Sequence, residues 1–185
     1  MAVVTALDTK LQTTDPRAIA RLLAPVGIAF EHWGVERLPA HLRGRNLSTE
    51  EKQQVLEAYK PELDRMKSQG GYVTADVISL WPDTPNIEAL CCKFDKKHIH
   101  TEDEVRFVVQ GRGVFRVFPD TGAALDIELH PGDYISVPAR YKHLFFLCAD
   151  KQITCIRLFV DAGGWVAHYA DEGLEQARAA GLVAK

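Results

Sequence analysis

The chain has 185 residues, of which 46% are hydrophobic and 25% charged, so it is long enough to fold as one globular domain with a full hydrophobic core. Its 22 basic and 25 acidic residues give a formal net charge of -3, and the basic residues form no stripe, which argues against nucleic-acid binding. The longest apolar runs are far too short to cross a bilayer, so we expect no membrane partner either.

The first predicted helix begins at Asp15-Pro16. Asp15 is a good N-cap and Pro16 suits the first helical position, while Pro25 should stop the helix shortly afterwards. Residues 28–33 then look like a strand, because they combine apolar and aromatic side chains over a short run.

A second predicted helix begins with the capping box Ser-Thr-Glu-Glu at residues 48–51 and ends at Gly70-Gly71. Between these signals, apolar residues recur at helical spacing: Val55, Leu56, Tyr59, Leu63 and Met66. Residues 1–70 are therefore predicted to form a mainly helical N-terminal extension.

From Tyr72 onward the pattern changes to short apolar or alternating runs separated by turn residues. The runs cover 76–80, 87–94, 104–109, 114–118, 126–129, 134–137, 144–147 and 153–159. Eight short strands at near-regular spacing indicate a mainly β protein, a sandwich or barrel of the jelly-roll kind. We expect one domain over 1–185, with the barrel at 72–160 and a final helix at 171–180.

Four cysteines, at positions 91, 92, 148 and 155, show neither a CxxC motif nor the spacing of a disulfide framework. Cys91 and Cys92 are neighbours in the predicted strand at 87–94, so their side chains should point to opposite faces. The first eight residues lack the basic and apolar segments of a secretory signal. Reduced thiols in a cytoplasmic protein are the simplest interpretation.

Three potential metal ligands lie close together at His98, His100 and Glu104. Residues two apart in an extended chain face the same way, so both histidines can reach one point. Glu104 opens the next predicted strand, which lets its carboxylate return to that point. Segment 132–143 supplies a fourth ligand, His143, after a turn, a strand and a proline bend. The pattern predicts one metal ion per chain, held by three imidazoles and one carboxylate.

This donor set suits Fe(II), Ni(II), Co(II), Mn(II) or Zn(II), whereas a structural zinc site would more often use thiolates. None of the four cysteines lies within the cluster. Around an octahedral ion, four protein ligands leave two neighbouring positions open, which is what a bidentate oxygen substrate needs. The pattern therefore favours catalysis. The remaining histidines, His32, His41, His130 and His168, are expected to be structural or surface residues.

The two ligand-bearing segments resemble the paired motifs of the cupins. The first motif, His-x-His, three residues, Glu, six residues and Gly, is met in full by His98, His100, Glu104 and Gly111. The second motif is met by Gly132, Pro138 and His143, but Arg140 stands where Gly is usual and Leu147 where Asn is usual. The resemblance implies the cupin fold, a double-stranded β-helix, which hosts many functions.

Within the cupins, the chain is most similar to the acireductone dioxygenases. The similarity is carried by Phe94, by the runs 98–107 and 138–146, by Gly70–Val77, and by Ile156–Phe159 followed by Gly164-Trp165. It spans most of the chain and is weakest over the first ~25 residues. Lys97 departs from the pattern, because many bacterial relatives have an acidic residue just before the first histidine.

The resemblance implies oxidative cleavage of an acireductone, 1,2-dihydroxy-3-keto-5-methylthiopentene, by O2. With Fe(II), members of the family give formate and 4-methylthio-2-oxobutanoate, the precursor of methionine in the methionine salvage pathway. With Ni(II), they give formate, carbon monoxide and 3-methylthiopropanoate. The ligands suit either ion, so the sequence leaves iron and nickel open.

Two arginines are candidate substrate-binding residues. Arg106 lies two residues after Glu104 and should share its inward face, where its charge could neutralise a bound dianionic enediol. Arg157 lies among apolar residues of a predicted strand, where a buried cation needs an anionic partner. Either arginine could instead form a structural salt bridge.

Three aromatic residues could line an apolar pocket for the methylthio tail: Phe94, Phe145 and Trp165. Phe145 lies two residues after His143 and should share its face. Each could equally fill the core. Glu102 and Asp103 are carboxylates near the ligands, but we expect them to be solvated.

Other functions remain open from the sequence. The nearest is a cupin dioxygenase acting on another enediol, a diketone or a thiol. A second is a metal-binding cupin without catalysis that senses or binds a small molecule, although Arg106 beside the ligands argues against it. A third is a non-oxidative isomerase. Nothing in the sequence demands more than a monomer.

Overall fold

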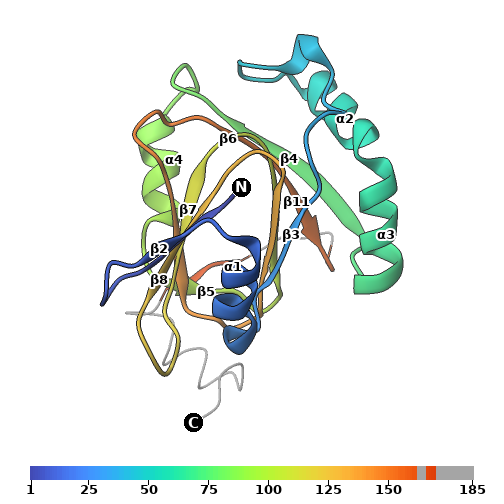
Figure 1. Ribbon diagram of the computed structural model, residues 1–185. Coiled ribbons are helices and arrows are strands. Elements are labelled where there is room, and N and C mark those ends of the chain that lie inside the picture. The colour runs from blue at the N-terminus through green and yellow to red at the C-terminus, as the bar shows by residue number, and fades with distance from the viewer. Residues whose placement is uncertain (162–165, 170–185) are drawn as a thin grey trace.

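The computed structural model describes residues 1–161 and 166–169, which form two antiparallel sheets that face each other, with helices on the outside (Figure 1). The seven-stranded sheet has the order β12 (His168–Tyr169), β5 (His98–Ile99), β10 (His143–Leu147), β7 (Gly113–Val117), β8 (Leu125–Leu129), β1 (Val3–Ala6) and β2 (Gln12–Thr13). The five-stranded sheet has the order β3 (Ala29–His32), β9 (Asp133–Val137), β6 (Glu104–Gly111), β11 (Ile153–Phe159) and β4 (Thr74–Leu80). The mainly β cupin architecture is confirmed.

Most predicted strands are confirmed, but the run at 87–94 is a helix, α4 (Ile87–Phe94), and the prediction of a strand there is wrong. Cys91 and Cys92 therefore follow each other around a helix and do not alternate across a sheet. The apolar spacing also fits one face of a helix, because Ile87, Leu90 and Cys91 lie at positions i, i+3 and i+4. A run this short does not distinguish the helical period of 3.6 residues from the strand period of two.

Four strands were missing from the sequence prediction: β1, β2, β5 and β12. Each has only two to four residues, too few to show an alternating pattern. β1 is nevertheless fully paired along β8, with Val4 opposite Ile127, so Val3–Ala6 form part of the barrel wall. The helix predicted at 171–180 lies outside the described residues.

The first helix, α1 (Pro16–Leu23), begins and ends as predicted. Oδ2 of Asp15 accepts a hydrogen bond from the Ala18 amide at 2.7 Å, and the helix passes into the short 3-10 helix η1 (Ala24–Val26) at the proline. A second 3-10 helix, η2 (Ala40–Leu42), precedes the next helical region. Within the described residues, no helix is long and apolar enough to span a bilayer.

The second predicted helix is divided into α2 (Thr49–Ala58) and α3 (Lys60–Gly70). Its capping box is present, with Ser48 and Glu51 bonding to each other's backbone amides. The break falls at Tyr59, where the backbone leaves helical geometry with ψ 14. Pro61 explains the break, because its ring would clash with the carbonyl of the residue four positions earlier.

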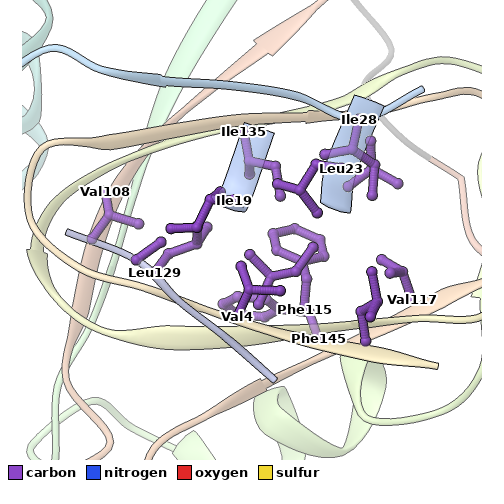
Figure 2. Packing of buried hydrophobic residues seen from close by; sticks show 14 of the residues in the cluster. Val4, Ile19, Leu23, Ile28, Val108, Phe115, Val117, Leu129, Ile135 and Phe145 are labelled. Atoms are coloured by element: carbon purple, nitrogen blue, oxygen red, sulfur yellow. The ribbon is translucent and has the colours of Figure 1, made fainter. Parts of the chain in front are cut away.

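Apolar side chains fill two separate cores. The first lies between the two sheets, where Val4, Phe115, Ile135 and Phe145 meet the inner side of α1 (Figure 2). The second lies between the outer face of the five-stranded sheet and helices α2 and α3, which run beside β4 in Figure 1. Strands β6 and β11 contribute alternate side chains to the two cores. Val105, Phe107, Ile156 and Leu158 face the outer core, so Arg106 and Arg157, which lie between them, point into the barrel.

Candidate metal centre

The four predicted ligands meet inside the barrel. His98 lies on β5, His100 follows it, Glu104 begins β6 and His143 begins β10. All four side chains are buried, and their ligand atoms lie within 4.8 Å of one another. They are the only such cluster found among the described residues.

Backbone pairing explains the convergence. His98 lies directly opposite His143 across the β5–β10 ladder, while Glu104 reaches the same point from the other sheet. The loops beside these strands are tied together, because the Arg140 amide donates a hydrogen bond to the His100 carbonyl at 2.7 Å. Asp103 accepts a second one from the Ala139 amide at 2.9 Å. Asp103 is exposed, as expected, and it also joins the two motif segments, a contact that the sequence does not predict.

Each histidine ring is held by its Nδ1 atom. The acceptors are backbone carbonyl oxygens: Lys96 for His98 at 2.6 Å, Val166 for His100 at 2.8 Å and Tyr141 for His143 at 2.7 Å. Because a carbonyl can only accept, Nδ1 must carry the proton in each ring. The Nε2 atoms are therefore unprotonated and available to coordinate an ion at the centre of the cluster, as in ligating histidines.

The centre needs a cation. Nε2 of His143 lies 2.7 Å and Nε2 of His100 3.1 Å from the same carboxylate oxygen, Oε2 of Glu104. A neutral Nε2 and a carboxylate oxygen are both acceptors, so either a proton or a metal ion must separate them. Burial and the neighbouring His143 lower the pKa of His98 to about 4, which keeps its ring neutral and ready to coordinate. Three imidazoles and a carboxylate fit a divalent transition-metal ion.

Arg106 is buried beside this cluster. Its Nε donates a hydrogen bond to Oε1 of Glu104 at 2.8 Å. The two carboxylate oxygens therefore have different partners, since Oε1 contacts Arg106 and Oε2 contacts His143 and His100. Burial alone would raise the pKa of Glu104, but Arg106 and the two histidines hold it well below its usual value. The Arg106 guanidinium carbon lies 4.3 Å from the Phe145 ring centroid.

Arg157 occupies the same inward face as Arg106, since the two residues are paired across β11 and β6. Its anionic partner is Asp76 on β4, with Nε–Oδ1 at 2.8 Å and Nη2–Oδ2 at 2.5 Å. The Arg157 side chain is 21% exposed and the Arg106 side chain 3%, so Arg157 lies nearer to solvent. The structure supplies the ion pair that a buried cation requires.

The predicted aromatic residues are only partly placed. Phe145 is buried between Arg106 and Phe115, whose ring centroid is 5.0 Å away. Phe94 ends α4, but its side chain lies outside the described part of the structure, as does Trp165. Glu102 is half-buried and not a fully solvated side chain.

The other histidines do not belong to the cluster. His32 pairs with the buried Asp133 at 2.9 Å, His41 contacts Gln54, and His130 lies 3.2 Å from Glu128. His168 belongs to the short strand β12 beside β5. Sequence spacing alone therefore separated the four clustered ligand candidates from the rest.

Sequence and structure comparisons agree on the family. The ARD/ARD' family matches residues 10–167. The acireductone dioxygenase of Exiguobacterium sibiricum is 40% identical over 178 residues, covering 96% of this chain and 99% of the relative. That of Geobacillus thermodenitrificans is 40% identical over 174 residues, covering 93% of this chain and 97% of the relative.

A solved structure gives the same answer. The acireductone dioxygenase of Bacillus anthracis, with a cadmium ion in its active centre, superposes with a TM-score of 0.87 at 38% identity, covering 91% of this chain and 98% of that one. Together with the buried cluster of three histidines and a glutamate, these matches identify a metal-dependent dioxygenase. The chain belongs to the ARD/ARD' family.

Proposed function

We propose that the chain cleaves acireductone, 1,2-dihydroxy-3-keto-5-methylthiopentene, with O2, and that His98, His100, Glu104 and His143 hold one Fe(II) or Ni(II) ion for this reaction. The observation that carries the proposal is the convergence of three Nε2 atoms and one carboxylate on a single buried point. The naming of relatives as acireductone dioxygenases supports the choice of substrate.

When bound, the metal ion would supply Lewis-acid chemistry that favours the doubly deprotonated enediol, the electron-rich form that O2 can attack. The products would be formate and 4-methylthio-2-oxobutanoate with iron, or formate, carbon monoxide and 3-methylthiopropanoate with nickel. The keto acid is the precursor of methionine, so the proposed context is methionine salvage. Four free thiols support a cytoplasmic setting.

Arg106 is the proposed counter-charge for the substrate. With the divalent ion and Glu104 it leaves two positive charges in the buried unit, which a doubly deprotonated enediol would cancel. A buried unit without net charge avoids the large cost of an uncompensated ion in a low-dielectric cavity. The 2.8 Å bond to Glu104 supports this role, because it fixes Arg106 beside the ligands.

The remaining candidates would shape the pocket. Arg157 lies on the same inward face and nearer to solvent, which suits a residue that contacts substrate as it enters. Phe145 closes the inner end beneath Arg106 and excludes water there. We propose Phe94 and Trp165 as further walls for the methylthio tail on the family resemblance alone.

The direct test is oxygen uptake on adding acireductone to iron-loaded protein, with the products identified afterwards. We expect stoichiometric O2 consumption and keto acid from the iron form, and carbon monoxide from the nickel form. The same assay with other enediols, diketones and thiols separates the rival dioxygenase functions. Protein that binds iron and acireductone but consumes no oxygen would contradict the proposed activity and favour a binding role.

A further inference from the structure

Cys155 is a fully buried thiol that the reaction proposed above does not use. It lies on β11, where Ile153 and Cys155 face the inter-sheet core while Ile156 and Leu158 face the outer core. The β11–β6 register shifts between Thr154 and Cys155, after which Cys155 is paired with Val108. Such irregularities re-aim side chains.

This register places the Cys155 thiol beside the guanidinium group of the buried Arg106. Cys155 is the diagonal neighbour of Arg106 across the two strands, and Nη1 of Arg106 donates a hydrogen bond to its Sγ at 3.6 Å. The distance is normal for a bond to sulfur, which is a large and weak acceptor.

Several of the described residues contact the guanidinium. Glu104 accepts a hydrogen bond from Nε, Cys155 accepts one from Nη1, and the ring centroids of Phe145 and Phe115 lie 4.3 Å and 5.6 Å from the guanidinium carbon. The contact to Glu104 fixes the position of Nε, whereas the tilt of the rigid guanidinium plane about that contact depends on what the outer nitrogens meet. Arginine has several rotatable bonds, so each fixed contact reduces the freedom that must be lost when a ligand binds.

A thiol suits this position better than either an apolar group or a carboxylate. An apolar group would remove the acceptor that Nη1 has on this side, and a carboxylate would cancel the positive charge of Arg106. Burial raises the pKa of the Cys155 thiol, so it stays protonated and uncharged near neutral pH. The positive charge on Arg106 is thereby kept available.

We propose that Cys155 is a positioning residue for the reaction: by accepting from Nη1 it holds the Arg106 guanidinium in the orientation that meets the dianionic substrate. The inference rests on the proposed function, since the orientation matters only if an anionic substrate binds beside Glu104.

Three substitutions separate this role from space filling. C155S keeps an acceptor of similar size, C155V fills the space without one, and Ile153→Val removes one methylene from the same core two residues earlier. We expect kcat/KM for acireductone to fall on the order of tenfold in C155V and to stay within about threefold of wild type in C155S. Ile153→Val should behave as wild type, and all three should retain their metal.

The loss in C155V should lie mainly in KM, because Arg106 counters charge already present on the bound substrate. If Cys155 only fills space, C155V should be more active than C155S, because a core tolerates valine better than a buried serine hydroxyl. Any loss would then appear as a lower kcat, since a smaller fraction of the protein would be folded and active. In an R106A background, C155V should have no further effect. Wild-type kinetics in C155V, or equal losses in C155S and C155V, would overturn the proposal.

A second measurement keeps the inference independent of the activity. In zinc-loaded protein, nitrogen NMR can follow rotation of the Arg106 guanidinium about its Nε–Cζ bond. We expect faster rotation in C155V and unchanged rotation in C155S. Absent turnover in wild type would overturn the proposed function alone, whereas unchanged rotation in C155V would overturn the positioning role alone.

Discussion

The two segments of the barrel that carry the ligands differ in how closely they match the cupin motifs, although both supply residues to the same centre. The first segment, 98–111, keeps every motif residue, whereas the second, 132–147, has Arg140 in place of the usual glycine. The structure shows why glycine is usual there: Arg140 has φ 63, in the left-handed region that favours residues without a Cβ. The turn keeps its shape and its amide still bonds to His100, so the second segment conserves conformation and ligand at the cost of some strain.

At position 111, by contrast, the surrounding backbone leaves no room for a side chain. Gly111 has φ 69, and a Cβ there would lie 2.0 Å from the backbone oxygen of Gln152, which cannot move aside. A Cβ at Gly132, where φ is 96, would lie 2.4 Å from the His32 ring, an obstacle formed by a side chain and not by backbone. Arg140 points its side chain to solvent and meets no such obstacle. A left-handed turn therefore tolerates a side chain only where the surrounding space is open.

The largest expected effect comes from removing one ligand from either segment. His98→Ala and His143→Ala should both lose metal affinity by several orders of magnitude, because each deletes one of four donors at a buried site. Metal analysis after iron loading and buffer exchange measures this, with His41→Ala, an exposed histidine, as the control. Full occupancy in either ligand variant would remove that residue from the proposed set.

Next in size is Arg106→Ala in the first segment. The kcat/KM for acireductone should fall roughly 100- to 1000-fold, with KM carrying much of the loss because Arg106 counters charge on the bound substrate, while metal content is retained. Steady-state kinetics alongside metal analysis measures both quantities. Unchanged kcat/KM would refute the charge-balancing role.

Gly111→Ala tests the intolerant turn. The clash with Gln152 and the left-handed backbone should lower the free energy of unfolding by at least ~2 kcal/mol, measured by chemical denaturation. Gly122→Ala is a matched control, since Gly122 also has positive φ but nothing lies within 4 Å of its Cβ position. A smaller loss at 111 than at 122 would contradict the steric argument.

The smallest effect is expected at Arg140. Arg140→Gly should relieve the left-handed strain and raise the free energy of unfolding by up to about 1 kcal/mol, partly offset by the greater freedom of glycine in the unfolded chain. Iron binding should be unchanged, because the amide that bonds to His100 remains. Destabilisation on this substitution would show that the Arg140 side chain stabilises the turn.

Local signals in the sequence were sufficient for the helix caps, the main strands and the four ligand candidates. Asp15, Ser48 and the glycine turns act on their immediate neighbours, and the ligand spacing follows from the two-residue repeat of a strand. The run at 87–94 was misread because its short apolar pattern fits both a strand and a helix, and packing beside β10 decided for the helix.

By itself, the sequence determined which residues could ligate a metal and that Arg106 shares their face, since both follow from periodicity over a few residues. Only the tertiary structure decided what each of these residues meets. The Val166 carbonyl that orients His100, the Asp76 partner of Arg157 and the Cys155 thiol against Arg106 all come from distant parts of the chain. Their pairing depends on strand order and on a register shift, which are set by the packing of the whole barrel and leave no local pattern in the sequence.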